Sequence, residues 1–279
     1  QKKSGKSHDI SKLELEHPGA NDKKYRARRN EIAEIAKKWR SKGGPIPEVT
    51  YSETENHTWE IILKKLEELH KDLAASNYLL SKDKLKFPKE KIPQLAIVNA
   101  DLNALSGFGV EPVEGLIDAK TFLSSFERKV MPCSQFIRHH LKPEYTPEPD
   151  IVHEIVGHVP MFVDPDFVEF SEMIGRAARI SKPTDLKKLE RLYWFTIEFG
   201  LIKEKGKLKV YGAGLLSSVG EIVHSLSNEV ERYDFEIEKV INQDYDFFRM
   251  QDKLFVISSF KDLKNQSETF LTSIINEKK

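Results

Sequence analysis

The sequence has little of several features that mark particular classes of protein. Its 279 residues include one cysteine, Cys133, which excludes an internal disulfide and favours a reducing, cytoplasmic location. Lys and Arg together number 44, as do Asp and Glu, so the charge balance predicts no attraction to nucleic acid or to an anionic membrane. No apolar run approaches the roughly 18 residues that a membrane span needs. The amino terminus also lacks the apolar stretch of a secretory signal.

What is present suits a globular protein. Hydrophobic residues make up 39% of the chain and charged residues 32%. The spacing of apolar residues predicts about ten helices and a few short strands, so the fold is expected to be predominantly α-helical. Strands and helices do not alternate regularly, which makes a parallel sheet an unfavoured prediction. We expect residues 1–20 to form a flexible segment and residues 21–279 to form a single catalytic domain.

Two histidines lie five positions apart in the segment HEIVGH, residues 153–158. Zinc proteases place two histidines four positions apart, on one face of a helix. A spacing of five turns His158 about 140° away from His153 on a regular helix, so both can reach one metal ion only where the helix bulges or ends. Gly157 permits such a break, and Pro160 disfavours helix in the residue before it. The alternative is two ordinary histidines, one buried and one capping the helix.

Glu198 lies inside an apolar helical run, YWFTIEF at residues 193–199. A buried carboxylate is costly unless it is paired or bound to a metal, and a nearby Arg or Lys would satisfy it. Joined to His153 and His158, it completes two histidines and one carboxylate, a set that leaves open positions on iron(II). Zinc accepts the same ligands, and a zinc hydrolase would use Glu154 as its general base. The residues alone do not decide between these metals.

Other reactive side chains are expected to be structural or solvated. His57 and His70 fall among charged residues of a helix predicted to begin near residue 52. Cys133 has no neighbouring base that would activate a nucleophile. Residues 131–150 contain four prolines and predict a loop-rich approach to the histidine segment, where functional residues often lie.

Long segments of the chain resemble the tetrahydropterin-dependent aromatic amino acid hydroxylases. The resemblance is carried by QFIRHHLKPEYTPEPDIVHEIVGHVPMF at 135–162, YWFTIEFGL at 193–201 and YGAGLLSSVGE at 211–221. It runs in family order from HPGANDKKYRARRNEIA near residue 17 to SSFKDLKNQ near residue 266, and it is strongest to members that act on phenylalanine. It implies a predominantly helical catalytic domain. The implied reaction is the hydroxylation of the L-phenylalanine ring to give L-tyrosine, with iron(II) and a tetrahydropterin activating O2.

The resemblance also assigns roles to individual residues. The implied iron ligands are His153, His158 and Glu198. The implied substrate-binding residues are Arg138, Thr146, Pro149, Asp150, Trp194, Gly214 and Ser217. The implied pterin-binding residues are Leu116, Ile117, Ala119, Phe122 and Glu154. Tyr193 is implied near the iron, and Tyr245 and Phe247 on a loop beside the site. Arg138 is expected to bind the substrate carboxylate, with Asp150 fixing its position.

Some positions depart from the family pattern or bear on the substrate. Pro132 stands where animal members have a histidine near the pterin, and His140 replaces a glycine. Trp194 and Phe247 favour phenylalanine, while tyrosine and tryptophan hydroxylation and a zinc hydrolase remain the alternatives. The regulatory domain and tetramerisation extension of animal members have no counterpart here, so a monomer or weak dimer is expected.

Overall fold

A computed structural model describes residues 18–144, 146 and 148–276 of the chain. The described residues are predominantly helical with a few short strands, as the sequence predicts. Residues 1–17 of the segment expected to be flexible lie outside the described residues, and residues 18–21 form the short helix α2 (Pro18–Asn21). None of the described helices is long and apolar enough to cross a membrane.

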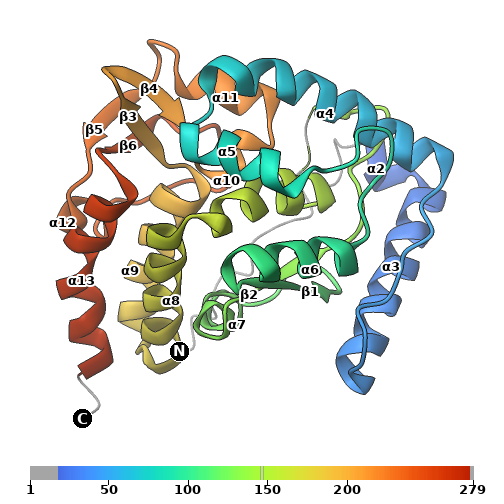
Figure 1. Cartoon of the computed structure of the whole chain (residues 1–279), viewed down its shortest axis with the longest axis horizontal. Helices are drawn as coiled ribbons and strands as arrows, with labels where there is room; N and C mark the ends of the chain where they lie inside the picture. Colours follow the sequence, from blue (N-terminus) through green and yellow to red (C-terminus); the bar gives the residue numbers. More distant parts are fainter. Residues whose placement is uncertain (1–17, 145, 147, 277–279) are drawn as a thin grey trace, which may run out of the picture.

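In the view of Figure 1, the first long helix lies at one side, the second runs across the top, and the next two lie below it in the middle. They are α3 (Lys23–Lys42), α4 (Glu53–Leu73), α5 (Ser76–Leu85) and α6 (Leu95–Ser106). The start of α4 is fixed by a capping box, in which Ser52 and Glu55 each accept a backbone N–H from the other. The apolar face of α4 includes the fully buried Trp59, whose indole N–H donates to the Pro88 carbonyl at 2.9 Å.

A small parallel sheet follows α6. Strands β1 (Gly109–Val113) and β2 (Val130–Ser134) pair in parallel and are joined by α7 (Ala119–Ser125) and the short helix η1 (Phe126–Arg128). A parallel-sheet fold was unfavoured in the prediction, and this two-stranded parallel pair lies within a predominantly helical fold. Part of the predicted proline-rich loop is a strand. Pro132 is tolerated in β2 because the sheet has two strands, so each strand keeps one edge without a partner.

The histidine segment and Glu198 lie in the middle of the chain, on two elements described in the next subsection, η2 (His153–His158) and η4 (Trp194–Glu198). Between them run η3 (Val159–Val163), α8 (Pro165–Ile180) and α9 (Pro183–Tyr193). Helix α8 begins with Pro165 at its first position, after an Asp164 cap whose side chain accepts the backbone N–H of Phe167. Phe108, Phe126 and Phe162 pack together behind the histidine segment, with the Phe108 and Phe162 rings stacked at 4.0 Å.

The carboxy-terminal part forms a second sheet and the helix that covers α8 (Figure 1). Its elements are β3 (Leu201–Glu204), β4 (Lys207–Val210), α10 (Ala213–Leu216), α11 (Val219–Ser225), β5 (Glu231–Asp234), α12 (Ile237–Val240), β6 (Lys253–Ile257) and α13 (Phe260–Asn276). The strand order is β4-β3-β6-β5, and β6 pairs in parallel with both β3 and β5. Lys205 and Gly206, both at positive φ, form the turn between β3 and β4.

Helix α8 packs closely on η1 because position 175 of α8 is a glycine. A Cβ at position 175 would lie 2.2 Å from the backbone nitrogen of Glu127. We expect Gly175→Ala to lower the free energy of unfolding by about 1–3 kcal/mol, because the two backbones must separate. Urea unfolding measures this change. Gly220→Ala is the control, since a Cβ there meets only the flexible end of Met250 at 3.2 Å. Equal losses in both variants would contradict the steric explanation.

Candidate active site

Two π-helical turns, η2 and η4, carry the predicted metal ligands. In a π turn the backbone hydrogen bonds join residues five apart instead of four. The N–H of Val159 donates to the Glu154 carbonyl, and the N–H of Phe199 donates to the Trp194 carbonyl at 2.9 Å. The predicted distortion of the helix between His153 and His158 is thus confirmed. Gly157 lets this turn lie close to α10, because a Cβ there would be 2.7 Å from the Ala213 carbonyl oxygen.

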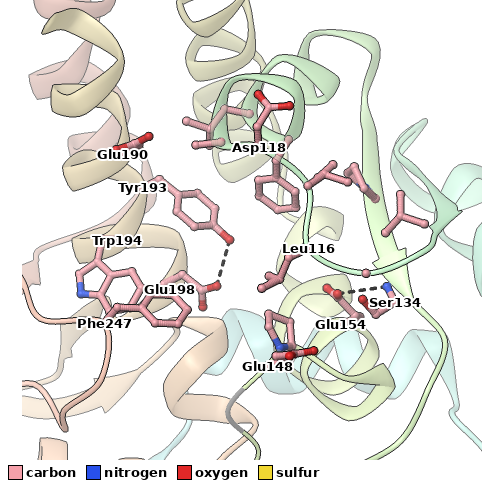
Figure 2. A pocket seen from close by; sticks show the side chains of 18 of the residues that line it. Leu116, Asp118, Ser134, Glu148, Glu154, Glu190, Tyr193, Trp194, Glu198 and Phe247 are labelled. Carbon is pink, nitrogen blue, oxygen red and sulfur yellow. Dashed lines mark hydrogen bonds between the residues drawn. The ribbon is translucent and has the colours of Figure 1, made fainter. Parts of the chain in front are cut away.

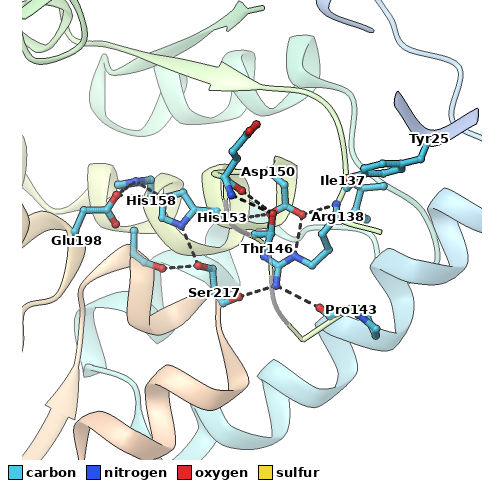
Figure 3. Close-up of polar contacts among 12 residues, drawn as sticks. Tyr25, Ile137, Arg138, Pro143, Thr146, Asp150, His153, His158, Glu198 and Ser217 are labelled. Atoms are coloured by element: carbon cyan, nitrogen blue, oxygen red, sulfur yellow. Dashed lines mark hydrogen bonds and ion pairs between the residues drawn. The ribbon is translucent and has the colours of Figure 1, made fainter. Parts of the chain in front are cut away.

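The π turns bring three ligand atoms together (Figure 3). The Nε2 atoms of His153 and His158 are 3.0 Å apart, and they lie 3.2 and 3.5 Å from Oε1 of Glu198. All three side chains are buried or nearly so. Within the described part of the chain, the ion-pair partners of Glu198 are these two histidines, so a partner Arg or Lys does not explain its burial.

The donor set fits a divalent metal ion. Ser217 donates its hydroxyl hydrogen to the Ala213 carbonyl at 2.7 Å, so its oxygen accepts the Nδ1–H of His153 at 3.0 Å. This hydrogen bond fixes the tautomer of His153 and leaves its Nε2 lone pair directed at the cluster. Oε2 of Glu198 is buried and has no hydrogen-bond partner among the described residues. Two imidazole nitrogens and one carboxylate oxygen converge here, a set that iron(II) or zinc accepts when it displaces the imidazole proton.

The electrostatics of the cluster keep Glu198 ionised. Burial acts to raise the pKa of Glu198, but the two histidines outweigh it and hold the pKa well below its usual value. The hydroxyl of Tyr193 donates to Oε1 of Glu198 at 3.0 Å, again across a spacing of five residues in a π turn (Figure 2). An ionised, hydrogen-bonded carboxylate beside two imidazoles is the form that binds a cation.

Arg138 and Asp150 form a buried pair beside the histidines (Figure 3). Arg138 donates from Nε and Nη2 to the two oxygens of Asp150 at 2.9 and 2.8 Å, and both side chains are at most 2% exposed. Asp150 also accepts the backbone N–H of His153 at 3.1 Å. Burial acts to raise the pKa of Asp150, but the charge of Arg138 holds it below its usual value. The pair is therefore ionic, and it connects the predicted substrate-binding arginine to the first residue of η2.

A cavity of about 640 Å³ opens beside Glu198. Figure 2 shows Leu116, Glu154, Trp194, Glu198 and Phe247 around it. All five predicted pterin-binding residues line this cavity, as do the predicted residues Pro149, Tyr193, Trp194, Tyr245 and Phe247. Pro132 lines it as well. Its walls are thus mostly aromatic and aliphatic, with carboxylates at a few places.

Other predicted residues, including the ligands His153 and His158, are not among the described residues that line this cavity. In the described structure Arg138, Thr146, Asp150, Gly214 and Ser217 are not part of its lining. The Thr146 hydroxyl donates to the Glu148 carbonyl at 2.7 Å, and Gly214 lies against the ring of Phe199.

Glu154 differs from the neighbouring Glu198 in its ionisation. Oε1 of Glu154 accepts the backbone N–H of Ser134 at 3.2 Å, and burial raises the pKa of Glu154 to about 8. The shift favours the protonated form, which can donate one hydrogen bond into the cavity.

Two residues that stabilise the site were missed in the sequence. His70, predicted to be solvated, is 1% exposed, and its Nε2–H donates to the Leu216 carbonyl at 2.8 Å. The Tyr78 hydroxyl donates to the Val156 carbonyl, inside η2, at 2.8 Å. Helix α5 thus fixes the π turn η2 through Tyr78, and helix α4 fixes Leu216, the residue before Ser217, through His70. The available signal was the spacing from Leu66 to His70, which places both on the apolar face of α4. His57, in contrast, is exposed as predicted.

Comparison with known proteins agrees with this arrangement. The model of the family described as "Biopterin-dependent aromatic amino acid hydroxylase" matches residues 6–278. The chain belongs to this family. It is 42% identical over 269 residues to phenylalanine-4-hydroxylase of Rattus norvegicus, covering 95% of this chain and 59% of that protein. It is 42% identical over 266 residues to tyrosine 3-monooxygenase of Homo sapiens, covering 94% of this chain and 50% of that protein. The chain therefore spans little more than half the length of these relatives.

Solved structures of the family share the fold. Phenylalanine hydroxylase from Colwellia psychrerythraea 34H, without ligand, superposes with a TM-score of 0.77 and 31% identity, covering 82% of this chain and 89% of that one. The Chromobacterium violaceum phenylalanine hydroxylase with bound iron(III) and 7,8-dihydrobiopterin superposes with a TM-score of 0.79 and 28% identity, covering 90% and 92%. The family assignment made from the sequence segments is confirmed.

The cluster predicts that metal binding depends on the charge of Glu198. We expect Glu198→Gln, which keeps the shape but removes the charge, to weaken iron(II) binding by at least about 100-fold while the helical circular dichroism persists. Metal analysis after equilibrium dialysis measures the loss. Glu190→Gln changes a cavity-lining carboxylate outside the cluster and should retain iron. Full iron content in Glu198→Gln would show that Glu198 is not a ligand.

His70 predicts a specific pH dependence of stability. Burial lowers the pKa of His70 to about 3, whereas an unfolded histidine titrates near about 6.5. Below a pH of about 6.5, His70 binds a proton in the unfolded state but stays neutral in the native state. The free energy of unfolding therefore falls as the pH falls. We expect this residue to account for about 2 kcal/mol of the loss between pH 7 and pH 5.

Urea unfolding of the metal-free protein at pH 7 and at pH 5 measures the contribution of His70 to the loss of stability. The loss on acidification should be smaller in His70→Gln by that amount and unchanged in His57→Gln, which alters an exposed histidine. Equal losses in the wild type and His70→Gln would mean that His70 is protonated in the folded protein.

Proposed function

We propose that this chain is an iron(II)- and tetrahydropterin-dependent monooxygenase that hydroxylates the ring of L-phenylalanine to L-tyrosine with O2. The convergence of His153, His158 and Glu198 beside an apolar cavity is the observation that carries the proposal. Family membership and the similarity to phenylalanine hydroxylases support it. When bound, iron(II) and the reduced pterin supply the site and the electrons for O2 activation.

The chain's own residues would hold and orient these groups. His153, His158 and Glu198 would bind iron through three neighbouring positions and leave the others open. Phe122 offers an aromatic face for a pterin ring, beside the backbone of Leu116, Ile117 and Ala119. Glu154, which lines the cavity, would form a hydrogen bond with a pterin heteroatom. The effect of Pro132 on the choice of pterin stays a prediction.

Arg138 is the proposed partner of the amino acid carboxylate. Its Nε and Nη2 are held by Asp150, whereas Nη1 makes two long hydrogen bonds, to the Pro143 carbonyl at 3.3 Å and the Ser217 carbonyl at 3.2 Å. A carboxylate is a stronger acceptor than either carbonyl, so it would replace these contacts. Asp150 would keep the guanidinium in place during that exchange.

The aromatic ring of the substrate would lie near Trp194 and Pro149, whose side chains line the cavity. Trp194 is fixed between the rings of Tyr245, stacked at 4.3 Å and 15°, and Phe199 at 4.6 Å. A flat, apolar wall of this kind suits an unsubstituted ring, because it has no polar group to pair with a ring hydroxyl.

A zinc hydrolase is less well supported. That reaction needs an ionised general base close to the metal. Glu154 is the candidate, but its Oε1 already accepts a backbone N–H from Ser134, and the family match is to hydroxylases.

We also propose that residues 21–279 form one catalytic domain located in the cytoplasm. One continuous cluster of buried side chains extends from Trp59 to Ile274, and the single cysteine is buried and reduced. A monomeric or weakly dimeric state stays a prediction.

Product analysis tests the proposed function. The iron-loaded protein, a tetrahydropterin and O2 are supplied with phenylalanine, tyrosine and tryptophan in competition. We expect tyrosine as the main product, with its new oxygen derived from isotopically labelled O2. A hydroxylated tyrosine or tryptophan as the main product would reassign the substrate. Zinc at full occupancy with pterin-independent hydrolysis would overturn the proposal.

Substitution of Arg138 tests its proposed role. Arg138→Ala should weaken phenylalanine binding by about 2–5 kcal/mol, because Asp150 is left unpaired as well as the substrate carboxylate. Arg138→Lys keeps a positive charge near Asp150 but loses the paired donors, so it should fold well and still bind weakly. Calorimetric titration measures the affinity, with the exposed Arg176→Ala as control. Unchanged affinity in both Arg138 variants would contradict the assignment.

A further inference from the structure

The segment Asp244–Gln251, here called the rim loop, connects α12 to β6 and borders the cavity. Tyr245, Phe247 and Phe248 from this loop line the cavity. Phe247, Phe248 and Met250 are nevertheless 47%, 43% and 51% exposed. The hydrophobic effect favours the burial of such side chains in the cavity or against each other. Their partly exposed positions therefore need polar contacts that hold the backbone of the loop in place.

The side chain of Gln251 provides such a restraint. It is 6% exposed, and every polar hydrogen of its amide is used. Nε2 donates to the carbonyls of Asp246 at 2.9 Å and Arg249 at 2.7 Å, which closes the rim loop on itself. Oε1 accepts the indole N–H of Trp194 at 3.0 Å. A single buried amide therefore joins the rim loop to a side chain of the cavity wall.

Further contacts hold both ends of the rim loop on the elements of the site. Arg191, in α9, donates to the Ile241 carbonyl at 3.1 Å and forms an ion pair with Asp244. His224, in α11, hydrogen-bonds through Nε2 to the backbone carbonyl of Gln251 at 3.1 Å. These contacts fix the ends of the loop, whereas the Gln251 amide fixes its middle relative to Trp194.

We propose that Gln251 is a specificity-determining positioning residue, whose amide sets the distance between the Trp194 indole and the Phe247–Phe248 rim. The Trp194 and Phe247 ring centroids are 5.4 Å apart, so the rim packs against the indole, and a rim that moves away from the indole widens the cavity for a larger aromatic ring. The proposal rests on the proposed function, since it assigns the cavity to an aromatic amino acid. Its physical basis is that a buried amide with all its hydrogen bonds made has one favourable position, and losing one partner is costly.

Two variants separate the hydrogen bond that Gln251 accepts from Trp194 from those that it donates to the rim loop. Gln251→Met has similar length and makes none of the hydrogen bonds. Gln251→Glu keeps an acceptor for Trp194 but loses both donations to the loop carbonyls. Gln243→Met is the matched control, because Gln243 lies just before the rim loop and its amide donates to the neighbouring Asp244 carbonyl instead of to the cavity wall.

The discrimination between phenylalanine and the wider tryptophan is the functional readout. We expect the ratio of the two kcat/KM values to fall roughly tenfold in Gln251→Met, mainly through KM, and to stay unchanged in Gln243→Met. Calorimetric Kd values on the iron-loaded protein without pterin report the same discrimination without turnover. A loss that is equal for both amino acids would overturn the proposal, because it would show general damage to the fold.

The indole N–H resonances provide a readout that needs no activity. Of the three tryptophans, Trp39 and Trp59 donate to backbone carbonyls, and Trp194→Phe identifies the third resonance. This resonance should move upfield in Gln251→Met, which removes the acceptor, and should not move upfield in Gln251→Glu, which keeps one. The amides of residues 246–250 should exchange faster in both variants. An unshifted resonance in Gln251→Met would overturn the proposal. Failure of the wild type to hydroxylate any of the three amino acids would instead overturn the proposed function.

Discussion

The five-residue spacing in two π-helical turns is the constraint on which the site depends. His153 with His158, and Tyr193 with Glu198, are pairs that a regular helix would turn about 140° apart. In η2 and η4 each pair meets, at 3.0 Å in both cases. A π turn is rare and persists only when the surrounding structure fixes it. Here the fixing contacts are Tyr78 on the Val156 carbonyl and the close approach of Gly157 to Ala213.

The metal cluster and the proposed carboxylate-binding arginine are joined through shared residues. Asp150 accepts hydrogen bonds from Arg138 and from the backbone of His153. Ser217 accepts from the His153 ring through its hydroxyl and from Arg138 through its carbonyl. The position of an amino acid held by Arg138 is thereby fixed relative to the metal, which is what attack at one ring position requires. The cavity that would hold a pterin lies on the side of Glu198, bordered by the rim loop.

Local patterns in the sequence were sufficient to predict the candidate metal ligands but not the residues and strands that surround them. The HEIVGH spacing predicted a distorted helix, and Glu198 was conspicuous as a carboxylate in an apolar run. The role of His70 was missed because its neighbours are charged, although its spacing from Leu66 places it on the buried face. The parallel β1–β2 pair was missed because Pro132 in β2, and the prolines that follow the strand, suggested a loop. Gln251 gave no signal, since the partners of a polar residue in an irregular loop are set by tertiary contacts.

A crystal structure of the iron(II)-loaded protein, with the metal located by its anomalous scattering, tests the central claim most directly. The predicted result is one iron ion bound by Nε2 of His153, Nε2 of His158 and the carboxylate of Glu198, with both π turns preserved. An iron ion bound through other groups would contradict the claim. So would a histidine segment that forms a regular α-helix, with His158 turned away from the metal.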